Sequence, residues 1–199
     1  MQHNLYTLDT SIPIWDRVFT VAPLVVIGTK EGDAYDLAPK HMVTPIGFDN
    51  YFGFVCTPKH ATYQNIKKNK EFTVSFPLPN QVVLASLSAS PRCDDISKSK
   101  SIIEALPTIK ATTVNALCIP KSYLLLECKL FKIIDGFKEN SIITGKVIAA
   151  LVDKNYLKDS EKDEQQQLKE NPLLAYIAYG RFAKITETYN FPFPKNFKR

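Results

Sequence analysis

The stretch PLVVIGTKEGDAYDLA, residues 23–38, has the sequence pattern of a β-hairpin. The run up to Thr29 is rich in β-branched residues, which favour a strand. Gly32 lies in the turn segment that follows and can adopt the positive φ that tight turns require. The chain then returns as a second strand. Pro39 either ends this strand or marks the edge of a sheet, because proline has no N–H to donate.

Short extended segments continue along the chain, and few helices interrupt them. The patterns predict strands at 42–48, 51–55, 71–76, 123–134 and 141–152, and helices at 61–68 and 102–106. Phe72, Val74 and Phe76 alternate with other residues, so we expect that strand to have one buried face. The β content favours a mainly β fold, a barrel with a few helical insertions, over a doubly wound parallel sheet.

The composition is that of an ordinary globular protein of one domain. The 199 residues are 45% hydrophobic and 23% charged, which excludes a mainly disordered, collagen-like or coiled-coil chain. Residues 153–171 are very polar and predict a solvated loop and a surface helix. Residues 173–185 return to the core. The tail 186–199 has no regular pattern, and it either frays or lies over another subunit, so the expected core covers roughly 18–185.

The spacing of cysteines and histidines argues against a metal site. No cysteine pair has CxxC spacing, so we expect four free thiols of an intracellular protein: Cys56, Cys93, Cys118 and Cys128. The histidines are too few for a multi-histidine site: His3, His41 and His60. The N-terminus does not resemble a signal peptide, and the longest apolar run is too short to span a bilayer. We therefore expect a soluble, cytoplasmic protein with no membrane association.

Signatures of several function classes are absent from the sequence. There is no GxGxxG, P-loop or GxSxG motif, and a hydrolytic triad would need an arbitrary choice of distant residues. The net charge of +5 is mild. The cluster Lys67–Lys70 is explained as the cation-rich end of a helix, so we expect no nucleic-acid partner.

The segment CTPKHAT, residues 56–62, lies between a predicted strand and a predicted helix. The start of a helix offers unpaired N–H groups and a partial positive charge. Thr57 and Thr62 add hydroxyls, Lys59 adds a formal charge, and His60 can donate a hydrogen bond. Such a set suits a phosphate monoester. The alternative is structural, with Thr57 or Thr62 capping the helix.

A second stretch, DLAPKHMVT, runs from residue 36 to residue 44. Ala38 and Pro39 are small and leave the strand backbone accessible to a flat ligand. Lys40 and His41 are then able to reach the polar edge of that ligand. The alternative is an edge strand with exposed polar side chains.

Taken in order, these segments resemble the flavin reductase-like family, whose fold is the FMN-binding split barrel. The similar segments, which cover roughly residues 18–185, are PLVVIGT (23–29), DLAP (36–39), VTPIGFD (43–49), KHATYQNI (59–66), EFTVS (71–75), the run from IP (119–120) to LEC (126–128), ITGKV (143–147), and the run from PLL (172–174) to YGRF (179–182). Many members have Ser where this chain has Lys40 or His41, and Asp where it has Ala61. The resemblance implies an FMN-binding split barrel that is Greek-key-like and α+β, and a homodimer with the flavin at the subunit interface.

The resemblance also implies roles for individual residues. FMN phosphate would bind Thr62 and the start of the helix, and backbone groups of Ala38 and Thr44 would meet the pyrimidine edge. Cys56 either flanks the flavin or is a small buried thiol. No catalytic side chain is implied, because flavin itself carries out hydride and electron transfer.

Three functions stay open. The first is a flavin reductase that takes a hydride from NAD(P)H, with a monooxygenase component as one recipient. The second is an FMN-binding electron-transfer protein without a pyridine nucleotide site. The third is a fold relative that has lost its flavin.

Overall fold

The computed structural model describes residues 4–90, 102–158 and 161–197. Its strands are β1 (Val21–Pro23), β2 (Val25–Glu31), β3 (Ala34–Lys40), β4 (Val43–Pro45), β5 (Tyr51–Cys56), β6 (Glu71–Phe76), β7 (Ile109–Lys110), β8 (Leu117–Cys118), β9 (Leu124–Phe137), β10 (Asn140–Val152), β11 (Leu173–Ile177) and β12 (Arg181–Ile185). Its helices are α1 (Ala61–Asn69), α2 (Val82–Leu87) and α4 (Glu164–Glu170), with 3-10 turns η1 (Pro79–Gln81) and η3 (Lys154–Tyr156) and a helical turn at 102–105.

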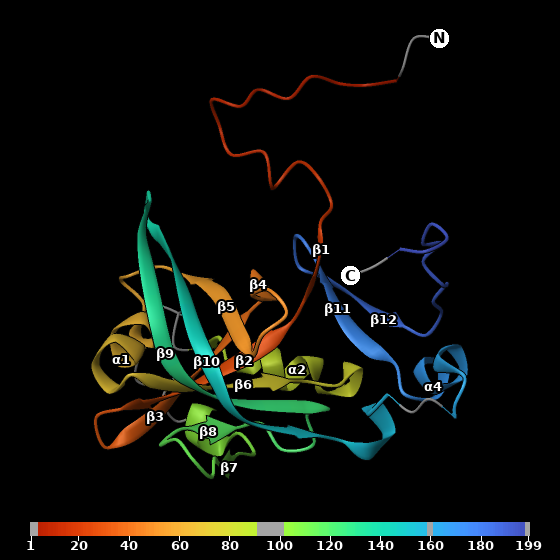
Figure 1. Cartoon of the computed structure of the whole chain (residues 1–199). Coiled ribbons are helices and arrows are strands. Elements are labelled where there is room, and N and C mark those ends of the chain that lie inside the picture. The colour runs from red at the N-terminus through yellow and green to blue at the C-terminus, as the bar shows by residue number, and fades with distance from the viewer. Residues whose placement is uncertain (1–3, 91–101, 159–160, 198–199) are drawn as a thin grey trace.

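Seven strands form one curled antiparallel sheet in the order β3-β2-β6-β9-β10-β5-β4 (Figure 1). The fold is mainly β and matches the split barrel expected from the sequence. The hairpin over residues 23–38 is confirmed, because β2 and β3 pair from Val25↔Lys40 to Glu31↔Ala34. Gly32 has a φ of 56°, as its turn position predicts.

The main hydrophobic core lies on one face of this sheet. It contains large side chains from β5 and β6, among them Phe52, Phe54 and Phe72, all essentially buried. Helix α1 adds Tyr63 and Ile66 to the same cluster. This explains why α1 packs tightly beside the sheet and why its first turn has a defined position.

The central strands β2 and β6 are buried on both faces, which corrects the expectation of one buried face for 71–76. Phe72 and Val74 belong to the main core, but Thr73 and Ser75 are also buried. The chain before β9 covers this second face: Thr73 Oγ1 donates to the Leu117 carbonyl at 2.5 Å, and the Ile119 N–H donates to Ser75 Oγ at 3.0 Å. These polar side chains are buried because a distant segment satisfies their hydrogen bonds.

A carboxylate anchors that covering segment. Glu127 is 3% exposed and accepts N–H groups from Thr112, Thr113 and Val114, together with both threonine hydroxyls, at 2.6–3.1 Å. Burial alone would raise the pKa of Glu127, but the hydrogen bonds from Thr113 and Thr112 outweigh it and lower the pKa from 4.5 to about 2. Glu127 therefore ties the sheet to its outer cover.

Close packing of the same cover requires a glycine in β2. A Cβ on Gly28 would lie 2.0 Å from the Leu117 carbonyl oxygen and 2.5 Å from Thr73 Oγ1. No L side chain fits between β2 and the covering segment without moving backbone.

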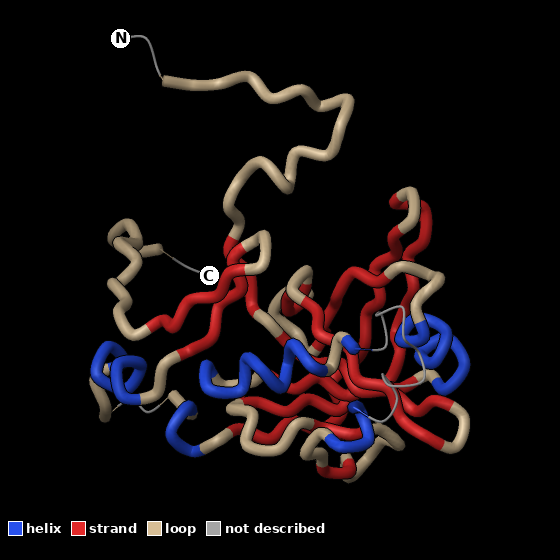
Figure 2. The backbone as a smooth tube through the Cα atoms, turned by 180° about the vertical axis from the view of Figure 1, so that it is seen from behind, coloured by secondary structure: helices blue, strands red, loops and turns tan. Residues whose placement is uncertain are grey.

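A smaller sheet joins the two ends of the chain in the order β1-β11-β12. The expectation that 173–185 returns to the core holds for β11, where Leu174 and Ala175 are buried, whereas β12 is largely exposed. The N-terminal segment before β1 extends away from the body, and residues 186–197 form no regular element, as the sequence predicts (Figure 2). The surface helix predicted within 153–171 is confirmed by α4, and neither α4 nor η3 contains a buried residue.

Of the two alternatives for Pro39, the edge position is confirmed, because β3 is an edge strand of the large sheet, and the strand end is wrong, because β3 continues to Lys40. One strand prediction needs a smaller correction. The strand predicted at 42–48 is shorter, and β4 covers Val43–Pro45 only. Here Gly47 adopts a φ of 73° and turns the chain away from an extended path.

The cysteines in the described residues are free and buried: Cys56, Cys118 and Cys128. Burial raises the pKa of Cys118 to about 11 and that of Cys128 to about 12, so both stay protonated and unreactive at neutral pH. Cys93 and His3 lie outside the described residues. Within the described part of the chain, no helix is long and apolar enough to cross a membrane.

We expect Glu127→Gln to lower the free energy of unfolding by about 3 kcal/mol at neutral pH, because the depressed pKa stabilises the folded state above the unfolded pKa. This contribution is lost as pH falls from about 4.5 towards 2, so the gap between variant and wild type should narrow over that range. Urea denaturation across the pH range measures the gap. The exposed residue Glu139 provides the control variant, Glu139→Gln. A difference in unfolding free energy that does not change with pH would contradict the anchoring role of the Glu127 carboxylate.

We expect Gly28→Ala to lower the free energy of unfolding by about 3 kcal/mol, because the added methyl group meets backbone. The matched control is Gly53→Ala in β5. Its Cβ would lie 2.8 Å from the end of the flexible Ile46 side chain, which can turn away. Equal losses in urea denaturation of the two variants would refute the close approach of β2 and the cover.

Candidate functional site

The start of α1 lacks a side-chain cap. The N-cap residue is His60, and its side chain makes no capping hydrogen bond. Thr57 Oγ1 donates to Asn140 Oδ1 at 3.3 Å, and Thr62 Oγ1 donates to Asp36 Oδ2 at 3.1 Å. The structural alternative, in which one of these threonines caps the helix, is therefore wrong. The Tyr63 N–H already donates to the His60 carbonyl at 3.1 Å, so the N–H groups of Ala61 and Thr62, which precede this first helical hydrogen bond, are the ones that can serve an anion.

A recess of about 230 Å³ separates this helix start from β3. We call it the helix recess; it is lined by Asp36, Leu37, Ala38, Lys59, His60, Ala61, Thr62 and Ser88. Four of the ten residues predicted from the sequence meet here: Ala38, Lys59, His60 and Thr62. The recess combines one exposed ammonium group with the positive end of a helix, which suits a phosphate.

A buried carboxylate modifies this part of the site. Asp36 is 4% exposed, lines the helix recess and holds the Thr62 hydroxyl. Thr62 must turn away from Asp36 before it can donate to a phosphate. Lys59 and the helix N–H groups fit a phosphate directly, whereas Thr62 fits one only after this exchange of partners.

A second recess of about 130 Å³ continues along β3 and shares His60 with the first. We call it the strand recess; it is lined by Pro39, Lys40, His41, Met42, Val55, Cys56, Thr57, His60 and Asn140. It brings together five more of the predicted residues: Pro39, Lys40, His41, Cys56 and Thr57. Cys56 is 2% exposed and belongs to the main core, which favours the buried-thiol interpretation.

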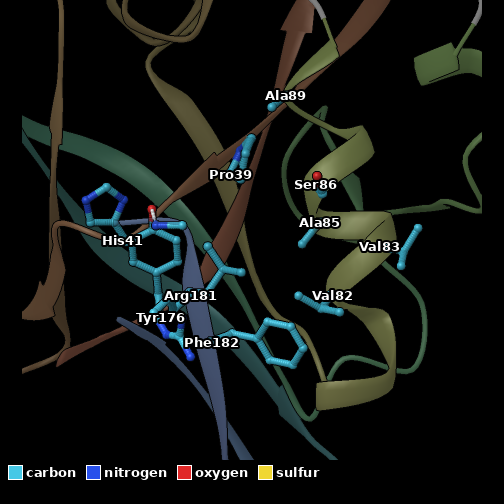
Figure 3. A pocket seen from close by; sticks show the side chains of 12 residues that line it. Pro39, His41, Val82, Val83, Ala85, Ser86, Ala89, Tyr176, Arg181 and Phe182 are labelled. Carbon is cyan, nitrogen blue, oxygen red and sulfur yellow. Dashed lines mark hydrogen bonds between the residues drawn. The ribbon is translucent and has the colours of Figure 1, made fainter. Parts of the chain in front are cut away.

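A larger cavity of about 530 Å³ adjoins the strand recess and shares Pro39 and His41 with it. We call it the α2 cavity, since α2 forms one wall and residues of β3, β11 and β12 form the other (Figure 3). The His41 ring stacks on Tyr176, with centroids 4.5 Å apart and an interplanar angle of 26°. This stack joins the edge of the large sheet to the small sheet.

Thr44 differs from the other predicted site residues. It is exposed on β4, its hydroxyl donates to the Pro45 carbonyl at 3.1 Å, and it lines none of these three cavities. Its role at the flavin stays a prediction.

Sequence reasoning missed the residues that the small sheet and α2 bring to the site. Tyr176, Arg181 and Phe182 line the α2 cavity opposite Val82 and Ala85. The run YGRF at 179–182 carried a family resemblance, but nothing in its spacing indicates that β11 and β12 lie beside β3. That placement follows from the pairing of β1 with β11 at the other end of the chain.

The three cavities offer binding surfaces along one strand. Their first end suits a phosphate, their middle is a strand with small side chains, and their far end is mostly apolar. No group of three or more His, Cys, Asp or Glu residues able to hold a metal ion occurs within residues 4–90, 102–158 and 161–197. The arrangement can bind and orient an extended, flat phosphate-bearing molecule.

Comparisons with solved structures show the same fold in three proteins. The 2-nitrobenzoate 2-nitroreductase NbaA of Pseudomonas fluorescens is 18% identical with a TM-score of 0.77, over 98% of this chain and 99% of that chain. An FMN-binding protein of Thermus thermophilus, with bound 1-cyclohex-2-enone, is 19% identical with a TM-score of 0.73, over 94% and 99%. A homolog of nitrilotriacetate monooxygenase component B from Mycobacterium thermoresistibile is 12% identical with a TM-score of 0.68, over 90% and 89%.

A search of the curated proteins finds no match. The family model described as "Flavin reductase like domain" matches residues 18–183, which include all the residues that line the helix recess, the strand recess and the α2 cavity. This membership supports a flavin-related oxidoreductase activity. The chain belongs to the flavin reductase-like family.

Proposed function

We propose that the protein is an FMN-binding oxidoreductase that accepts a hydride from NAD(P)H and passes the electrons to a second acceptor. The observation that carries the proposal is the continuous surface along β3, which joins the uncapped start of α1 to the small residues Ala38 and Pro39. Bound FMN would supply the hydride and electron transfer. The absence of a catalytic acid or nucleophile motif in the sequence agrees with this division of labour.

The chain's own residues would bind and orient the FMN. Lys59 and the first N–H groups of α1 would hold the phosphate. Ala38 and Pro39 would present accessible backbone to the flavin ring, with Lys40 and His41 near its polar edge. His60 lines both recesses and stands between the phosphate end and the ring end.

We further propose that the protein works as a homodimer built from a single domain, with the flavin at the subunit interface. Large apolar side chains are exposed on the body, such as Val21 on β1 (71% exposed) and Leu151 on β10 (57% exposed). Such side chains are available to a subunit interface, where contiguous apolar surface is typical. The reduced cysteines support residence in the cytoplasm. A monooxygenase component is a candidate recipient, as the name of the Mycobacterium relative suggests.

An electron-transfer protein that keeps FMN permanently is the second candidate. The likeness to the FMN-binding protein of Thermus thermophilus favours it, because that name implies no pyridine nucleotide. Reduction by NADH or NADPH distinguishes the two functions.

The phosphate site is tested by FMN affinity. Thr62→Ala should weaken FMN binding by about 1 kcal/mol, because the hydrogen bond to the phosphate replaces the one that Thr62 donates to Asp36 in the free protein, and Thr62→Ser should restore it. Lys59→Ala should weaken binding in a salt-dependent manner, since an exposed charge is screened. Lys68→Ala, at the other end of α1, is the matched control. Unchanged affinity in both Thr62→Ala and Lys59→Ala would place the phosphate elsewhere.

The activity is tested by an absorbance spectrum of the protein with added FMN, before and after anaerobic addition of NADH and then of NADPH. We expect a bound-flavin spectrum that bleaches with at least one nucleotide, which also identifies the donor. Bound flavin that neither nucleotide bleaches would replace the reductase with the electron-transfer protein. If no flavin binds, both functions fail.

A further inference from the structure

The α2 cavity lies beyond the two recesses to which the phosphate and the flavin ring are assigned above. Its walls are apolar: Val82 and Ala85 of α2 face it from one side and Phe182 of β12 lines it from the other (Figure 3), and Val83 is also among its lining residues. Val83 is 66% exposed and Phe182 is 52% exposed, although both lie at a concave surface. Apolar walls around a concavity of about 530 Å³ are typical of sites for small molecules.

One end of the cavity is aromatic. His41 and Tyr176 stack at 4.5 Å, and the Gly180 N–H donates to Tyr176 Oη at 2.9 Å. The stack and this hydrogen bond restrict the orientation of the tyrosine ring. An aromatic pair whose orientation is restricted in this way is a favourable contact for another planar ring.

The charge at the cavity is positive. Arg181 lines it, and none of the described lining residues is Asp or Glu. No acidic side chain forms an ion pair with Arg181 in the part of the chain that the structure describes. A guanidinium beside apolar walls is suited to a planar carboxylate, which it can bind through two parallel hydrogen bonds.

We propose that the α2 cavity binds a small planar aromatic molecule that carries one negative group. The ring would lie between the apolar wall of α2 and the His41–Tyr176 stack, and the anionic group would meet Arg181. A dinucleotide fits this lining less well, because its two phosphate charges would face one permanent cation. The cavity shares Pro39 and His41 with the strand recess, so the ligand would lie beside the flavin; only this last point rests on the proposed function.

Three probes separate the contributions of ring and charge: benzoate, the neutral benzamide, and acetate, which has the charge without the ring. Titration calorimetry or ligand-observed NMR gives the affinity of each. We expect benzoate to bind more tightly than both other probes. Arg181→Gln should weaken benzoate binding about fivefold, or about 1 kcal/mol, and leave benzamide unchanged. Phe182→Ala should weaken both aromatic probes.

Lys184→Gln provides a matched control, because Lys184 is an exposed cation on the same strand and does not line the cavity. It should bind benzoate as the wild type does, and thermal unfolding checks that each variant remains folded. Benzoate binding no tighter than benzamide, or a benzoate preference that survives Arg181→Gln, would overturn the proposal. Nicotinamide binding more tightly than benzoate would also overturn it and assign the cavity to the donor ring.

The titrations are made with and without FMN. FMN that fails to bind while benzoate still depends on Arg181 would defeat the proposed function and leave the cavity assignment intact. FMN that binds while benzoate does not would defeat the cavity assignment alone.

Discussion

The rest of the architecture depends on the hydrogen bonds that the buried Glu127 carboxylate accepts. Its hydrogen bonds to residues 112–114 hold the covering segment against the outer face of β2 and β6. That cover buries both strands on two sides, which agrees with the unbroken apolar sequence of the first half of β2, residues 25–28. With β2 held in the interior, β3 lies at the edge of the sheet, where its residues are available to the cavities.

The sequence pattern within a segment was sufficient to predict the elements that depend on residues nearby in the sequence. The hairpin of β2 and β3, the helix α1 and the long strands β9 and β10 follow from alternation, turn chemistry and helical spacing. The second buried face of β6 does not, because Thr73 and Ser75 find their partners 44 residues away. A buried threonine whose hydroxyl bonds a residue so far away in the sequence has the same sequence neighbours as an exposed threonine.

The candidate site likewise combines residues that the sequence pattern predicts with residues that it does not. The residues of 36–41 and 56–62 were recognisable because each set is contiguous and carries its chemistry in its own spacing. The contact between Thr62 and Asp36 joins the two sets and changes the environment expected for a phosphate. Arg181 and Tyr176 were out of reach, because their place depends on how the end of the chain pairs with its beginning.

Pro39 also affects how the molecule can associate. An exposed strand edge is a template on which another chain can add a strand through backbone hydrogen bonds. Proline has no N–H, and in sheets its donor-less side generally faces outward from an edge strand. Among the strands that the structure describes, β3 pairs in the large sheet with β2 alone. Pro39 therefore disfavours strand addition along β3 and protects the edge that lines the cavities against edge-to-edge aggregation.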